Sequence, residues 1–132
     1  MEKITDEYLL KAARKVRENA VAKLSGFKVG AALLAASGTV YTAANIESDI
    51  PALSVCADRL ALFMALSAGE TKFEKIALFM ETKTATPCGA CRQVLFEFCG
   101  PDLKIIAANI SGKMKNFILS ELLTHPYEKE RG

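Results

Sequence analysis

The sequence predicts a single domain of the α/β class, in which helices pack on a sheet. Three observations lead to this prediction. The chain has 132 residues, 51% of them hydrophobic, so it is as long as one domain and can bury a core. Its periodic segments follow the order α-β-β-α-β-α-β-β-α, in which two helices each connect two strands. Neither a repeat nor a linker divides it, so we expect residues 1–132 to fold as one domain.

The first expected element is a helix over residues 5–23. Thr5 can cap its N-terminus, and the two acidic residues that follow suit the helix dipole. Ser25-Gly26 then ends the helix. Apolar residues recur between these points at helical spacing, namely Leu9, Ala13, Val16 and Ala20.

A hairpin is expected next, because two apolar stretches are separated by the turn Ser37-Gly38. The first stretch is Phe27–Ala35 and the second is Val40–Asn45. A loop over residues 45–54 follows.

The second half of the chain alternates helices and strands. Ser54 can cap a helix over residues 55–68, which Gly69 ends. Thr86-Pro87 starts the next helix, since proline suits the first helical position. That helix ends near Cys99-Gly100-Pro101. The remaining segments are a buried strand at Phe73–Glu81, a strand at Leu103–Asn109, an edge strand at Lys113–Phe117 and a short helix at Ser120–Leu123.

Charge and hydropathy exclude several classes of protein. Lysine and arginine number 17 against 15 acidic residues, with no basic stripe, so we expect no nucleic-acid partner. The longest uninterrupted apolar run, Leu60–Leu66, is too short to span a membrane. The charged N-terminus, Met1 to Lys3, is not typical of a signal peptide, so a cytoplasmic location is expected. The mean hydropathy of +0.18 is high for so small a chain and favours a subunit interface.

Three of the four cysteines stand where helices begin. Cys88 and Cys91 are spaced to share one face at the start of a helix, and Cys56 begins the preceding helix. Two parallel crossovers bring helix N-termini to the same edge of a sheet, so three thiolates can converge on one zinc ion. Three protein ligands leave a fourth position for water, as in catalytic zinc sites. Asp58 places a carboxylate beside that water, and Arg59 can offset the charge of the sulfurs.

Other interpretations of these residues stay open. Cys88 and Cys91 alone would also suit a redox pair, and all four cysteines would suit a disulfide framework in a secreted protein. Cys56 alone would suit an inert core thiol, the role that we expect for Cys99. Asp58 alone would suit an ordinary exposed helix carboxylate. The two helix starts together, Cys-Ala-Asp and Pro-Cys-Gly-Ala-Cys, are more specific than any one part.

The sequence resembles the cytidine deaminase family, zinc enzymes that hydrolyse free pyrimidine nucleosides. The resemblance runs from Phe27 to Tyr127. It is strongest in four motifs, which are Phe27-Lys28-Val29-Gly30-Ala31-Ala32-Leu33, Asn45-Ile46-Glu47, Cys56-Ala57-Asp58-Arg59 and Pro87-Cys88-Gly89-Ala90-Cys91-Arg92-Gln93-Val94-Leu95.

The resemblance implies a three-layer α/β/α fold with a five-stranded mixed sheet and helices on both faces. It also implies a zinc ion, a small-molecule nucleoside substrate and a homotetramer. The short apolar runs noted above lead us to expect no membrane partner. The implied reaction is hydrolysis of cytidine, deoxycytidine or a related aminopyrimidine nucleoside to the uridine product and ammonia. The resemblance implies that the zinc ligands are Cys56, Cys88 and Cys91, that Asp58 transfers protons, and that Arg59 hydrogen-bonds the ligand sulfurs. It further implies that the sugar is contacted by Asn45 and Glu47 and the base by Phe27 and the Ala57 backbone. Tyr127 is implied to contact the substrate as well.

The chain departs from the family pattern at three places. Asp58 stands where the family has glutamate, which leaves open a catalytically weak or inactive relative that holds zinc and binds nucleosides. The substrate loop has Ser48–Ala52 in place of the usual Asn-Ala-Ser-Tyr-Gly, so the nucleoside that it accepts stays open. Tyr127 falls where the family has a phenylalanine that reaches a neighbouring subunit's pocket.

Overall fold

The computed structural model describes residues 3–81 and 86–130. Met1 and Glu2, part of the charged N-terminus discussed above, lie outside the described residues. Within these ranges, no helix is long and apolar enough to cross a membrane. The elements are α1 (Asp6–Arg17), β1 (Gly30–Ala35), β2 (Val40–Ala44), the 3-10 turn η1 (Pro51–Leu53), α2 (Ala57–Ser67), β3 (Phe73–Met80), α3 (Gly89–Cys99), β4 (Lys104–Asn109), β5 (Met114–Ile118) and α4 (Leu119–Leu122).

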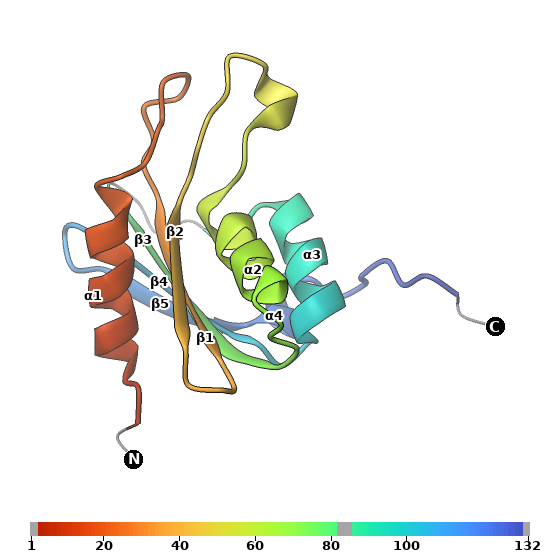
Figure 1. Ribbon diagram of the computed structural model, residues 1–132. Helices are drawn as coiled ribbons and strands as arrows, with labels where there is room; N and C mark the ends of the chain where they lie inside the picture. The colour runs from red at the N-terminus through yellow and green to blue at the C-terminus, as the bar shows by residue number, and fades with distance from the viewer. Residues whose placement is uncertain (1–2, 82–85, 131–132) are drawn as a thin grey trace.

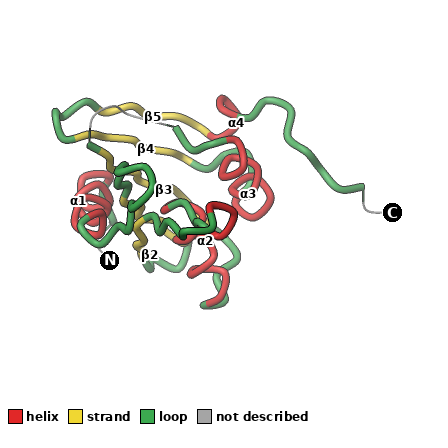
Figure 2. The backbone as a smooth tube through the Cα atoms, turned by 90° about the horizontal axis from the view of Figure 1, so that it is seen from above, coloured by secondary structure: helices red, strands yellow, loops and turns green. Residues whose placement is uncertain are grey.

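The strands of the described chain form one mixed sheet in the order β2-β1-β3-β4-β5. Only β3 and β4 pair in parallel, while the other neighbours are antiparallel. The helix α1 covers one face, and α2 and α3 cover the other (Figures 1 and 2). The predicted fold class, the five-stranded sheet and the edge position of the last strand are therefore confirmed.

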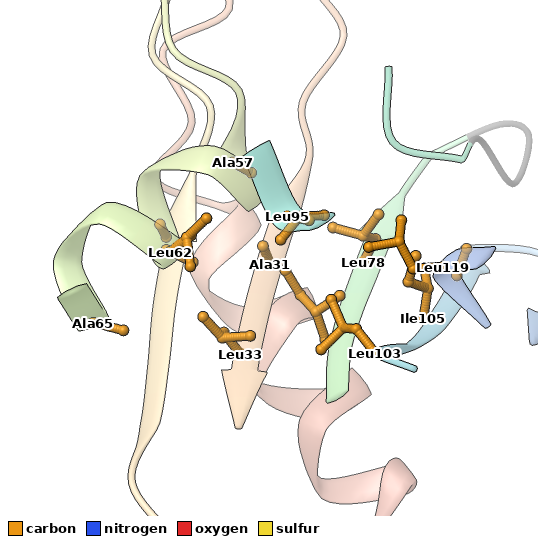
Figure 3. Close-up of a cluster of buried hydrophobic side chains, with 14 of the residues drawn as sticks. Ala31, Leu33, Ala57, Leu62, Ala65, Leu78, Leu95, Leu103, Ile105 and Leu119 are labelled. Atoms are coloured by element: carbon orange, nitrogen blue, oxygen red, sulfur yellow. The ribbon is translucent and has the colours of Figure 1, made fainter. Parts of the chain in front are cut away.

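The sheet builds its two cores by alternation of side chains along buried strands. In β1, Ala31 and Leu33 pack with α2 and α3, whereas Ala32 and Leu34 pack under α1. The larger core lies on the side of α2 and α3 (Figure 3). All six residues of β1 are buried, which explains why this segment is apolar without interruption.

The direction of the strands places the site. Both β2 and β3 run antiparallel to β1, so they point the same way, and β4 runs parallel to β3. The helix α2 connects β2 to β3, and α3 connects β3 to β4. Both helices therefore begin at the same edge of the sheet, as the two predicted crossovers require.

Three predicted helix ends are wrong. The first helix ends at Arg17 instead of residue 23, because the backbone of Val21 pairs with the segment around Ile46. Ser54 does not cap α2, since its hydroxyl accepts the N–H of Ser48 instead, and Cys56 is the N-cap residue. The helix α3 begins after Cys88 rather than at Thr86-Pro87.

Helix α1 approaches β1 so closely that Gly30 has no room for a side chain. A Cβ atom there would lie 1.9 Å from the carbonyl oxygen of Ala13. The backbone of α1 thus rests directly on the sheet at this point.

We expect Gly30→Ala to lower the free energy of unfolding by at least about 2 kcal/mol, because α1 must move off the sheet. Gly89→Ala is the control, since a Cβ at Gly89 meets nothing within 4 Å. Chemical denaturation of both variants checks this. Equal stability of the two variants would contradict the close packing of α1.

Candidate metal centre and substrate pocket

The sulfurs of Cys56, Cys88 and Cys91 lie within 4.8 Å of one another. Cys56 is the N-cap residue of α2, and Cys88 is the N-cap residue of α3. Cys91 lies one turn into α3 and is buried, and its N–H points to the Cys88 sulfur at 3.5 Å. The structure therefore brings together the three sulfurs that the sequence singled out.

This cluster fits a tetrahedral zinc ion. A Zn–S bond of about 2.3 Å puts two sulfurs of a tetrahedral site about 3.8 Å apart, within the observed limit. Hydrogen bonding with Cys91 holds the pKa of the Cys56 thiol at about 6, and the same contact raises the pKa of Cys91. The Cys56 thiol therefore loses its proton readily, and the resulting thiolate is the form that binds metals.

Cys99 lies outside this cluster. Burial raises the pKa of its thiol to about 12, so it stays protonated near neutral pH. This is the behaviour expected of an inert core thiol.

Asp58 lies in the first turn of α2 and is 5% exposed. The alternative that it is an ordinary exposed carboxylate is therefore wrong. Burial raises the pKa of the Asp58 carboxyl, and hydrogen bonding with Cys91 and the backbone only partly opposes this. Arg59 follows, and its positive charge acts on both Cys56 and Asp58. The cluster thus has a carboxyl group beside it that holds a proton more readily than an exposed aspartate.

A pocket of about 300 Å³ opens onto this cluster. Its walls include every predicted site residue except Cys91, Arg59 and Tyr127. The lining residues are Ser25, Phe27, Val29, Asn45, Glu47, Cys56, Ala57, Asp58, Leu78, Met80, Thr86, Pro87 and Cys88.

The rim of the pocket is fixed by the segment Asn45–Glu47, which pairs with Val21 on one side and Val55 on the other. The Asn45 side chain accepts the N–H of Val29 at 2.8 Å. It also donates to the carbonyl of Phe27 at 2.9 Å. Asn45 thereby holds the chain on either side of Lys28 against the pocket.

Glu47 binds the turn before Phe27. Its Oε1 accepts the N–H groups of Leu24 and Ser25 at 2.8 and 2.9 Å, and its Oε2 accepts the Ser25 hydroxyl at 2.5 Å. Hydrogen bonds from Ser25 lower the pKa of the Glu47 carboxyl, so it stays charged. The sequence predicted Ser25 only as part of a helix end and gave it no role in the site, because its contact with Glu47 spans 22 residues.

Arg92 is a further residue that sequence reasoning did not single out. Its guanidinium donates to the carbonyls of Pro87 at 2.7 Å and Leu122 at 2.8 Å, and to the Thr86 hydroxyl. These bonds hold the segment that leads into Cys88. An arginine directly after the second cysteine of the motif was the available signal.

Tyr127 is 72% exposed and is not among the described residues that line the pocket. Its backbone N–H and carbonyl bond to the side chain of Gln93 on α3 at 3.0 and 2.8 Å. Beyond α4 the chain runs away from the sheet (Figures 1 and 2). The predicted substrate contact of Tyr127 in a neighbouring subunit stays a prediction.

Residues 3–107 match the family model of the cytidine and deoxycytidylate deaminase zinc-binding region. The chain belongs to this family. Among its relatives, the cytidine deaminase of Sporosarcina psychrophila is 39% identical over 125 residues, which are 94% of this chain and 92% of that protein. The cytidine deaminase of Halalkalibacterium halodurans is 42% identical, covering 94% and 95%. The crystal structure of cytidine deaminase from Burkholderia pseudomallei superposes with a TM-score of 0.90 at 40% identity, covering 93% and 99%. The resemblance predicted from the motifs is thus confirmed.

For this member of the deaminase family, we expect the purified protein to carry one zinc ion per chain. Replacing Cys56, Cys88 or Cys91 by serine should remove most of the zinc, because serine is a poor ligand for zinc. Metal analysis by mass spectrometry measures this, with Cys99→Ser as the matched control that keeps its zinc. Loss of zinc in the control, or full zinc in any of the other three variants, would contradict the assignment.

The bonds to Glu47 predict a dependence of stability on pH. The pKa of Glu47 is lower in the folded state than in the unfolded state, so its contribution is complete above the unfolded pKa. That contribution is lost as the pH falls through the folded pKa. We expect the difference in unfolding free energy between the wild type and Glu47→Gln to shrink in acid, as measured by denaturation at a series of pH values. A difference that does not change with pH would contradict this.

Proposed function

We propose that this protein is a zinc-dependent hydrolase that converts cytidine or deoxycytidine, with water, to the uridine product and ammonia. One observation carries the proposal. Three cysteine sulfurs and a buried carboxyl group meet at one end of a pocket of about 300 Å³. The relatives named above, which align over nearly the whole chain, are cytidine deaminases. The alternative of a relative that only binds nucleosides is therefore not favoured.

The residues of the cysteine cluster and Asp58 have separate chemical roles. Cys56, Cys88 and Cys91 would hold the zinc ion, which supplies Lewis-acid activation of water. Asp58 moves the protons. Its carboxylate takes a proton from the water and, as the carboxylic acid, gives it to the ring nitrogen next to the reacting carbon. The water oxygen bonds to that carbon. A second proton, from the hydroxyl group that the carbon has gained, passes through the same carboxyl to the amine, and the carbon–nitrogen bond breaks as ammonia leaves.

Burial suits Asp58 to this task, because a raised pKa lets its carboxyl group hold the proton more readily between the two transfers. Arg59 contributes positive charge beside the thiolates. Its distance along the helix from Cys56 is three residues, which places both near the N-terminus of α2.

The substrate is held by the walls and rim of the pocket. Phe27 and the backbone of Ala57 contact the base, together with the apolar wall formed by Leu78 and Met80. The sugar carries hydroxyl groups and lies at the rim, where Asn45 and Glu47 offer polar atoms. This arrangement directs the reacting carbon of the base toward the cysteine cluster.

The assembly that we propose is a homotetramer, in which Tyr127 reaches the pocket of a neighbouring subunit. Its support is the set of exposed apolar side chains, which includes Tyr127, and the course of the chain after α4, which runs away from the sheet (Figure 1). Exposed apolar side chains on and before α2 include Ile50, Leu53, Phe63 and Met64.

We also propose a cytoplasmic location, because a reducing compartment keeps the three thiols available for zinc.

The direct test is turnover of cytidine and deoxycytidine, followed by ammonia release and the change in ultraviolet absorbance. We expect Asp58→Asn to lower kcat by about 10²–10⁴-fold with its zinc retained, because it keeps the size of the side chain but cannot carry a proton. Asp58→Glu is the matched variant, and it should keep measurable turnover. Absence of turnover by the zinc-loaded wild type would defeat the proposed function, and equal kcat values for wild type and Asp58→Asn would defeat the role of Asp58.

A further inference from the structure

The hydroxyl of Ser25 joins two residues that line the pocket. It donates to Oε2 of Glu47 at 2.5 Å and accepts the N–H of Phe27 at 3.0 Å. A serine hydroxyl has one hydrogen to donate, and here it is used on Glu47. Ser25 itself lines the pocket, so this link is part of the pocket wall.

The hydrogen bonds of Glu47 leave little of its acceptor capacity for a ligand. A carboxylate offers about four lone-pair sites, two on each oxygen. Oε1 already accepts two N–H groups, those of Leu24 and Ser25, and is filled. Oε2 accepts the Ser25 hydroxyl, which leaves one position. The carboxylate therefore has room for a single further donor.

We propose that Ser25 is a positioning residue that orients Glu47 so that its one remaining acceptor position, on Oε2, receives a single hydroxyl of the substrate sugar. The inference rests on the proposed function, because it takes a nucleoside as the ligand of this pocket. Ser25 also ties Phe27, which contacts the base, to the same network. The two ends of the substrate are thus held by side chains that share one serine.

The chain contains the same hydrogen-bond pattern a second time, away from the pocket. The hydroxyl of Ser37 donates to Oε2 of Glu70 at 2.8 Å and accepts the N–H of Thr39 at 3.3 Å. In both places the serine bonds the N–H two residues later and a distant glutamate. Ser37 lies between β1 and β2 and is not among the described residues that line the pocket. Ser37→Ala is therefore a matched control for Ser25→Ala.

The first measurement is steady-state deamination of cytidine by the wild type and three variants. Ser25→Ala should raise KM about tenfold and leave kcat within about threefold, because a hydrogen bond to a charged group is lost at the sugar and not at the reacting carbon. Ser25→Thr, which keeps a hydroxyl, should restore KM to within about threefold of the wild type. Ser37→Ala should match the wild type in both constants. Thermal unfolding of each variant identifies any that fail to fold, in which case the threonine variant decides.

The second measurement compares substrates that lack one hydroxyl, 2′-deoxycytidine and 3′-deoxycytidine. In the wild type, removal of the hydroxyl that Glu47 receives should lower kcat/KM by about tenfold or more. The same removal should cost Ser25→Ala much less. The inference would be overturned if each missing hydroxyl lowered kcat/KM by the same factor in the wild type and in Ser25→Ala. An unchanged KM for cytidine in Ser25→Ala would also overturn it.

Binding of the product separates this inference from the proposed function. Calorimetry with uridine and its 2′-deoxy and 3′-deoxy forms measures the same penalties without turnover. If the wild type turns over no nucleoside, the proposed function fails, and the calorimetric penalties still decide the role of Ser25. If the wild type does not bind uridine, the inference on Ser25 is overturned.

Discussion

The site depends on two helices that begin at one edge of the sheet. Because β2, β3 and β4 point the same way, α2 and α3 both start where β2 and β3 end. Cys56 and Cys88 are the N-cap residues of these helices, so their positions follow from the strand directions. Cys91 completes the cluster from one turn further along α3. The unpaired N–H groups and the dipole at helix N-termini favour negative charge, which suits a group of thiolates.

The wall of the pocket carries two kinds of chemistry. Cys56 and Cys88 lie in it with the buried Asp58, whose carboxyl has a pKa raised by desolvation. At the rim, the side chains of Asn45 and Glu47 form most of their hydrogen bonds with the backbone around Phe27. The rim residues therefore both shape the pocket and face its contents. Asp58 is only 5% exposed, so its carboxyl is enclosed by the protein.

The elements of the fold could be predicted because periodic apolar residues and turn residues mark them locally. Two of their ends could not, because the Val21 backbone pairs with the distant segment around Ile46 and the Ser54 hydroxyl bonds Ser48 in the preceding loop instead of capping a helix. The convergence of the cysteines was predictable from the crossovers. Ser25 and Arg92 were missed for a related reason, because their partners lie 22 residues away for Ser25 and up to 30 residues away for Arg92. Gly30 was visible in the sequence, but the approach of α1 that requires it belongs to the packed structure.

X-ray absorption at the zinc edge of the purified protein tests most directly whether three sulfurs from two helix starts hold one metal ion. We expect three sulfur neighbours at about 2.3 Å and one oxygen or nitrogen neighbour. Four sulfur neighbours, or fewer than three, would contradict it.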